Sequence, residues 1–182
     1  STFISGVIFC MTIFQIGQKA AIVADIAEHA TNLFEKYKFF YNNLPPELKP
    51  TEKKSNAKEL VVQYANGQTS SIRIMVQGDS AGRSGTYQFL HLSECAFWSD
   101  LQATLVSLLQ TVSATNKKSM VFLETTANGV NEYKRRWDKD FSGQTNYVPK
   151  FYAWFTTRRY ALDEKDIKPF KKPNWLVELQ EK

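Results

Sequence analysis

Strand-length apolar runs alternate with helix-patterned segments along this chain. Three of the runs are "KAAIVAD" (19–25), "YQFLHL" (87–92) and the apolar start of "SMVFLETTANG" (119–129), and each is followed by a segment that favours a helix. This alternation predicts an α/β domain with a largely parallel central sheet flanked by helices. Ligands of such sheets bind at the carboxyl ends of the strands, so residues that follow these runs are the first candidates for a site.

The first helix is expected within Phe3–Ile16, which is apolar almost all round. That pattern predicts a helix buried on nearly every side, and the segment is shorter than the roughly 20 residues of a membrane span. No membrane partner is expected. Cys10 and Cys95 both lie among apolar residues, which predicts buried free thiols. With two histidines and no metal-ligand spacing, a structural zinc is improbable.

The remaining elements follow from periodicity and turn residues. Glu28–Leu44 predicts an amphipathic helix, and the polar segment from Pro45 to Lys58 predicts a surface loop. Glu59–Val76 contains two β-rich runs around Asn66-Gly67, which indicates a hairpin or meander. Ser99 and Gln102 have the form of a capping box that opens the next helix, and Tyr147–Phe155 is one more strand-like run. The core face of the Glu28–Leu44 helix should consist of Ala30, Leu33, Phe34, Tyr37 and either Phe40 or Tyr41.

Polar residues close two of the strands. Ser93-Glu94 follows the run 87–92, and an acid at the end of a buried strand is typical of a Walker B element, where it orients or activates water beside a phosphate. The usual ending is Asp-Glu, so a magnesium contact from Ser93 would involve a hydroxyl or a water. The alternative is a strand-end acid that merely faces solvent. His91 lies within the strand and is interpreted as a core histidine.

The chain opens on Ser1-Thr2 and an apolar helix, which matches the end of a phosphate loop, GxxxxGK[ST], or an ordinary helix N-cap. We expect the chain to begin just after such a loop. Arg83 lies in a loop rich in glycine and serine, from which a guanidinium could reach a phosphate; a plain surface arginine is the alternative.

The net charge of +5 suits an anionic partner, although an excess of this size is common in proteins that bind no nucleic acid. Lys134, Arg135 and Arg136 lie in the predicted helix "EYKRRWDKDF" and could contact a DNA backbone without reading its sequence. The acids of the same helix make a solvated face equally plausible.

Five blocks together resemble the ATPase domain of the large terminase subunit of tailed bacteriophages. In order, they are "STFISGVIF", "AIVAD" with "NLFEKYKFFYNNLPPELKP", "AGRSGTYQFLHLSECAFW", "VFLETTANG" and "YVPKFYAWF". The resemblance implies a P-loop NTPase of the ASCE type, truncated at the phosphate loop. Residues 1–155 would be the ATPase domain without its phosphate-loop strand, and residues 156–182 a linker toward a nuclease domain beyond the chain.

The resemblance also assigns roles. Glu94 matches the catalytic carboxylate of Walker B, and Arg83 the arginine that such motors offer to the nucleotide of the neighbouring subunit. Ser1 matches the hydroxyl that ends Walker A, with Thr2 beside it, both at the nucleotide. Magnesium would be held by Ser1 and Ser93, and Ser93 differs from the Asp of the wider family. The coupling motif that senses the γ-phosphate corresponds to Thr125, Thr126 and Asn128.

The family's function would make the protein a Mg²⁺-dependent ATPase that drives double-stranded DNA into the procapsid. Its partners would be DNA, the portal protein, the small terminase subunit and further copies of itself in a ring, in the host bacterial cytoplasm and transiently on the procapsid. The 182 residues alone are expected to hydrolyse ATP poorly or not at all. Two alternatives stay open: a helicase-like or repair P-loop ATPase, and an inactive prophage-derived module that binds DNA or a partner.

Overall fold

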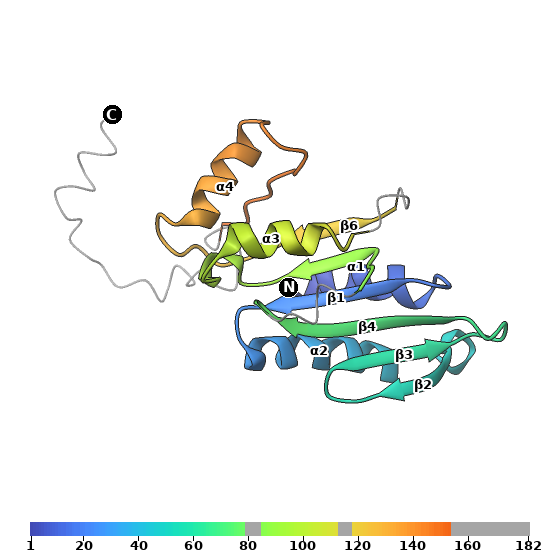
Figure 1. Ribbon diagram of the computed structural model, residues 1–182. Coiled ribbons are helices and arrows are strands. Elements are labelled where there is room, and N and C mark those ends of the chain that lie inside the picture. Colours follow the sequence, from blue (N-terminus) through green and yellow to red (C-terminus); the bar gives the residue numbers. More distant parts are fainter. Residues whose placement is uncertain (79–84, 113–117, 154–182) are drawn as a thin grey trace, which may run out of the picture.

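A computed structural model describes residues 1–78, 85–112 and 118–153, and shows one sheet between layers of helices (Figure 1). The sheet has six strands in the order β2-β3-β4-β1-β5-β6. β4, β1, β5 and β6 run parallel, whereas β3 pairs antiparallel with β4 and β2 antiparallel with β3. The strands are β1 (Lys19–Ala24), β2 (Thr51–Ser55), β3 (Glu59–Gln63), β4 (Thr69–Val76), β5 (Phe89–Leu92) and β6 (Met120–Leu123). The predicted α/β class and largely parallel sheet are confirmed.

Helices cover both faces of the sheet. One apolar core joins the sheet to α1 (Thr2–Ile13) and α2 (Ala27–Asn42), and a second joins the opposite face to α3 (Leu101–Leu109). α4 (Glu132–Phe141) lies on the α3 side, where Tyr133 packs against the second core. Among the described residues there are also two short 3₁₀ helices, η1 (Pro46–Leu48) and η3 (Cys95–Phe97).

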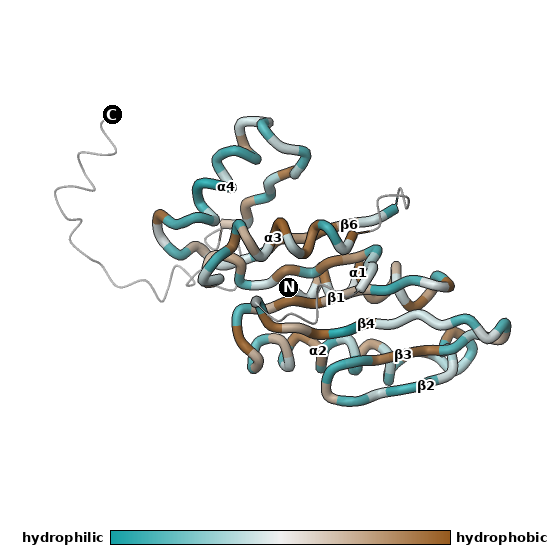
Figure 2. Tube along the Cα trace, viewed as in Figure 1, coloured by the Kyte–Doolittle hydropathy of each residue, from teal (hydrophilic) through white to brown (hydrophobic). Residues whose placement is uncertain are grey.

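β1 shows why the sheet needs both layers. Successive side chains of a strand point to opposite faces, so Ala20 and Ile22 enter the core beneath α1 and α2, while Ala21 and Val23 enter the core beneath α3. A strand buried on both faces is apolar throughout, as central parallel strands are. Figure 2 shows this apolar band along the central strands. In α2, the buried positions are Ala30, Leu33, Phe34, Tyr37 and, of the two alternatives, Tyr41.

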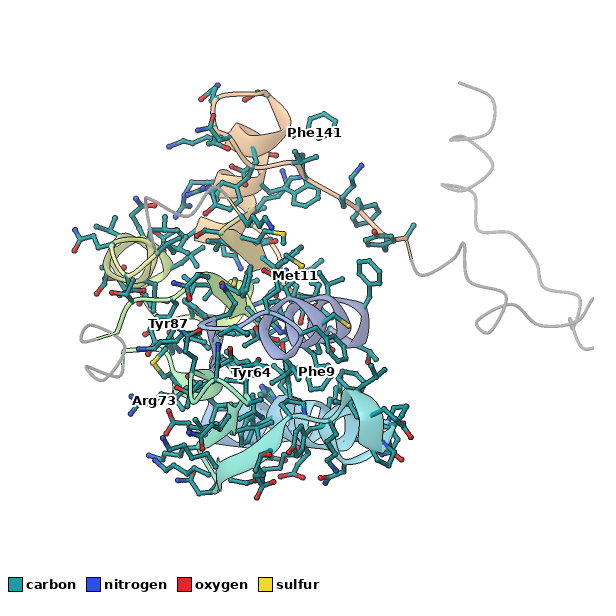
Figure 3. All side chains as sticks on the ribbon, turned by 90° about the vertical axis from the view of Figure 1, so that its right-hand side faces the viewer. Phe9, Met11, Tyr64, Arg73, Tyr87 and Phe141 are labelled. Carbon is teal, nitrogen blue, oxygen red and sulfur yellow. The ribbon has the colours of Figure 1, made fainter. Side chains whose placement is uncertain are left out.

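α1 differs from the prediction because only one of its faces is covered. Ile8, Phe9 and Ile13 are buried, whereas the side chain of Phe3 is 77% exposed and Cys10 is exposed. The prediction of a buried thiol is therefore wrong for Cys10 and right for Cys95. The end of α1 is held by Tyr64, whose hydroxyl donates to the carbonyl oxygen of Ile13 over 2.8 Å beside the core (Figure 3). Within the described residues, no helix is long and apolar enough to span a membrane.

Three further predictions need correction. The polar segment 45–58 contains η1 and strand β2, which pairs with β3 through its backbone although all its side chains are exposed. α3 is capped by Asp100, which accepts a hydrogen bond from the amide of Ala103, so Ser99 and Gln102 form no capping box. Residues 147–153 form no strand, and residues 154 and 155 lie outside the described residues. The hairpin around Asn66-Gly67 is confirmed as β3 and β4.

Candidate functional site

The carboxyl ends of β1, β5 and β6 meet at one edge of the sheet. β5 and β6 pair in parallel with Leu92 opposite Leu123, so Ser93 and Glu124, the next residues, lie side by side. The amide of Ser93 donates to Val23 on one side, and the amide of Glu124 donates to Leu92 on the other. Polar residues that follow separate strands are therefore brought into one cluster, as the strand-end argument predicts.

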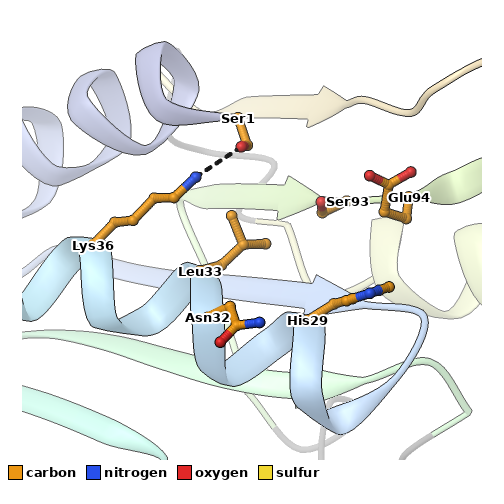
Figure 4. Close-up of a pocket in the computed structure, with 7 residues that line it drawn as sticks. All are labelled: Ser1, His29, Asn32, Leu33, Lys36, Ser93 and Glu94. Atoms are coloured by element: carbon orange, nitrogen blue, oxygen red, sulfur yellow. Dashed lines mark hydrogen bonds between the residues drawn. The ribbon is translucent and has the colours of Figure 1, made fainter.

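An open pocket of about 160 Å³ lies at this edge, between the start of α1, the end of β5 and one face of α2. Figure 4 shows Ser1, Ser93 and Glu94 on one side of it and the side chains of α2 on the other. Its lining consists of Ser1, His29, Asn32, Leu33, Lys36, Ser93 and Glu94.

Glu94 has an unusual backbone. Its φ of 55° and ψ of 41° are left-handed helical, and it is the only residue other than glycine with a positive φ in the described part of the chain. A left-handed conformation costs a residue with a Cβ about 1–2 kcal/mol. Such strain persists only where the surroundings impose it, and it is concentrated at functional sites. The turn directs the chain from β5 into η3 and leaves the Glu94 carboxylate in the lining of the pocket.

The predicted coupling residues lie around this turn. Glu94 Oε2 accepts hydrogen bonds from the hydroxyls of Thr125 and Thr126, at 3.3 and 3.4 Å, and from the amide of Thr126 at 3.4 Å. Asn128 donates to the carbonyl oxygen of Ala96 in η3 over 3.2 Å. At these lengths each bond is weak, but together they connect the segment after β6 to the segment that carries Glu94.

Ser1 and Thr2 lie across the pocket at the start of α1. Lys36 Nζ of α2 donates to Ser1 Oγ over 3.0 Å and to Thr2 Oγ1 over 3.3 Å. Ser1 is at the N-cap position, but its side chain makes no capping hydrogen bond. The hydroxyl therefore does not play the ordinary N-cap role that the sequence left open.

α2 contributes three pocket residues that were not predicted from the sequence. His29, Asn32 and Lys36 are spaced three and four residues apart, which puts them on one helical face, and all three line the pocket. His29 Nδ1 lies 2.7 Å from the carboxylate of Asp25, and this hydrogen bond raises the pKa of His29. The spacing of the polar residues in the 28–44 helix indicates this shared face, whereas the prediction for that helix rested on its apolar positions alone.

Glu124, which follows β6 directly, is another residue of the site that the sequence did not predict. Glu124 Oε1 accepts hydrogen bonds from His91 Nε2 over 2.7 Å and from Ser93 Oγ over 3.3 Å. Glu124 Oε2 lies 2.8 Å from the backbone nitrogen of Ser1. Burial acts to raise the pKa of Glu124, but the bonds from His91 and Ser1 outweigh it and lower the pKa to about 2. The carboxylate is therefore ionised at neutral pH.

His91 is a fully buried core residue, as predicted, and it has two polar partners. Its Nε2 donates to Glu124 over 2.7 Å, and its Nδ1 shares a 3.1 Å hydrogen bond with the hydroxyl of Tyr37 in α2. Tyr37 is also fully buried. A continuous polar path therefore runs from Tyr37 of α2, along the sheet face that α1 and α2 cover, to the strand ends where Ser1 and Ser93 lie.

The sequence offered two sources of positive charge, Arg83 and the basic residues of α4. Arg83 falls within 79–84, outside the described residues. In α4, Lys134 pairs with Asp138, and Arg136 pairs with Asp140 over 3.0 Å and stacks on Tyr147. Arg135 is exposed on the same helix. The acids of α4 therefore neutralise much of its positive charge.

No protein-family model matches the chain. Among solved structures, it is similar to the large terminase of a thermophilic bacteriophage, with 10% identity over 76% of this chain and 34% of that one, and a TM-score of 0.58. It is also similar to the large terminase ATPase domain of Thermus phage P74-26, with 17% identity over 73% of this chain and 57% of that one, and a TM-score of 0.57. The fold is therefore that of large-terminase ATPase domains, and the chain spans between a third and somewhat over half of these neighbours.

Proposed function

We propose that this chain is the ATPase motor part of a phage large terminase, which hydrolyses ATP to move double-stranded DNA into a procapsid. The proposal rests mainly on Glu94. This carboxylate is held in a strained turn after a parallel strand, contacts Thr125 and Thr126, and lines a pocket with Ser1 of α1. The terminase-like fold supports the same assignment.

In the proposed reaction, Glu94 orients and activates the water that attacks the γ-phosphate. The donor set suits magnesium, because the hydroxyls of Ser1 and Ser93 and the Glu94 carboxylate give oxygen atoms, which hard cations prefer. Ser1 and Ser93 would hold the ion. Bound Mg²⁺ would supply positive charge that neutralises the charge developing on the phosphate.

The remaining roles concern assembly and coupling. Thr125, Thr126 and Asn128 would transmit the state of the γ-phosphate, because hydrogen bonds connect them to Glu94 and to η3. Arg83 would act on the nucleotide of a neighbouring subunit in a ring. The partners would be DNA, the portal protein and the small terminase subunit, in the host cytoplasm and on the procapsid. Residues 1–155 would belong to the ATPase domain, and 156–182 would lead to a nuclease domain.

The test is ATP turnover by the full-length protein with and without double-stranded DNA, for the wild type and Glu94→Gln. We expect the variant to bind nucleotide and to lose turnover by at least about a hundredfold. Glu52→Gln is the matched control, since this exposed glutamate lies in the outer strand β2, three strands away from β1 in the sheet. Wild-type-like turnover in Glu94→Gln would refute the role of Glu94. No turnover in folded wild type would favour a non-catalytic module.

A further inference from the structure

Ser93 has no charge at the position where P-loop ATPases place an aspartate that holds magnesium. We infer that Glu124 supplies the missing negative charge and acts through the hydroxyl of Ser93, as a positioning residue for the metal. This inference rests on the proposed ATPase function and adds a residue from a different strand to its metal site.

The first support is the contact itself. Ser93 Oγ lies 3.3 Å from Glu124 Oε1, and because an ionised carboxylate only accepts, the hydroxyl is the donor of this long hydrogen bond. The two acceptor sites of the hydroxyl oxygen are then available to the pocket, which Ser93 lines. A serine alone would offer a neutral hydroxyl in either orientation, whereas the pair offers an oriented oxygen backed by a full negative charge.

The second support is the connection to Ser1. The other carboxylate oxygen, Glu124 Oε2, lies 2.8 Å from the backbone nitrogen of Ser1. One carboxylate therefore connects the two residues proposed to hold the metal, Ser1 and Ser93. Glu124 does not line the pocket, which fits a residue that acts from behind the ligands.

The third support is the way Glu124 is held. His91, fully buried, donates from Nε2 over 2.7 Å, and Tyr37 fixes the other ring nitrogen over 3.1 Å. Hydrogen-bonded groups behind the direct ligands orient them, and their loss typically costs about 10–100-fold in metal affinity. If Glu124 only neutralised its partners in the fold, a folded Glu124→Gln variant would keep wild-type metal affinity.

The experiment measures metal affinity, not turnover. Mn²⁺ binding to the full-length protein in complex with ADP is followed by electron paramagnetic resonance, and ADP affinity is measured in parallel without metal. We expect Glu124→Gln and Ser93→Ala each to weaken Mn²⁺ binding about 10–100-fold, while metal-free ADP affinity stays within about twofold of wild type. Ser93→Ala leaves the bond between His91 and Glu124 in place. Because Glu124 is inferred to act through this hydroxyl, unchanged Mn²⁺ affinity in Ser93→Ala would overturn the inference even if Glu124→Gln folds poorly.

The double variant Ser93→Asp/Glu124→Gln is the rescue. It returns a carboxylate to position 93, and we expect Mn²⁺ affinity within a few-fold of wild type; Glu52→Gln should not change it. Wild-type-like Mn²⁺ affinity in the folded single variants would overturn this inference but not the proposed function. The same conclusion would follow if metal-free ADP affinity fell as much as Mn²⁺ affinity, or if the folded double variant did not recover Mn²⁺ affinity. Folded wild type that binds no ADP would overturn the proposed function and the inference with it.

Discussion

The left-handed backbone of Glu94 leads to a prediction about stability that is separate from catalysis. At φ 55° and ψ 41°, a residue with a Cβ carries about 1–2 kcal/mol of strain, which glycine does not. Glycine also makes the unfolded chain more flexible, which costs about 0.4–1 kcal/mol. The difference predicts that Glu94→Gly is more stable than Glu94→Ala by about 0.5–1 kcal/mol. Both variants lose the bonds from Thr125 and Thr126, so that loss cancels.

The assay is urea unfolding of the ATPase domain, phosphate loop included, followed by tryptophan fluorescence. A second pair of variants, Glu35→Gly and Glu35→Ala, is the control. Glu35 lies in a middle turn of α2, and its side chain is exposed to solvent. At this position the glycine variant should have an unfolding free energy about 1 kcal/mol lower than that of the alanine variant. The sign of the difference should therefore reverse between the two positions. If glycine is the less stable residue at both, Glu94 is not strained and the reasoning is wrong.

Two further predictions concern charges near the pocket. Against the opposing effect of burial, the hydrogen bond from His91 lowers the pKa of Glu124 below its ordinary value of 4.5, so the contribution of this carboxylate to stability is present above about pH 4.5 and is lost as the pH falls below it. We expect wild type to lose more stability than Glu124→Gln as the pH is lowered in urea unfolding; parallel pH profiles would contradict this. Lys36 donates to Ser1 and Thr2 at the pocket, so we expect its ammonium to attract the phosphates of bound ATP. Lys36→Met should then weaken ATP binding about tenfold in a fluorescent-nucleotide titration. The control Lys38→Met removes a cation that pairs with Glu35, and it should bind ATP with wild-type affinity. Equal ATP affinities in the two variants would exclude a role for Lys36.

The sequence predicts those parts of the fold in which burial imposes a pattern. β1 and β5 are buried on both faces and appear as continuous apolar runs, so they were found. β2 was missed because the segment "TEKKS" is exposed at every position and is held by backbone pairing with β3. Charged residues are common on an edge strand, where they discourage pairing with other chains, and they leave no apolar periodicity.

The site divides in the same way. Glu94, Thr125 and Thr126 follow strands, and the rule for parallel sheets brings strand ends together without further information. Lys36 and His29 join them only because α2 packs with its polar face toward the same edge, which depends on the helix rotation that its apolar residues set. Glu124 also follows a strand, but nothing in the sequence indicates that it pairs with His91, 33 positions away.

The register of β5 and β6 decides whether the proposed metal site exists. Leu90 pairs with Val121 and Leu92 with Leu123, and this alignment puts Ser93 next to Glu124. A shift of two residues would keep every side chain on its present face but would separate Ser93 from Glu124 by roughly 7 Å along the strand. The shift would also break the hydrogen bond between His91 and Glu124, so the buried histidine and the carboxylate would each lose this partner. The polar pair therefore selects the register that the apolar pattern alone would not, and the same bonds that define the fold here also define the site.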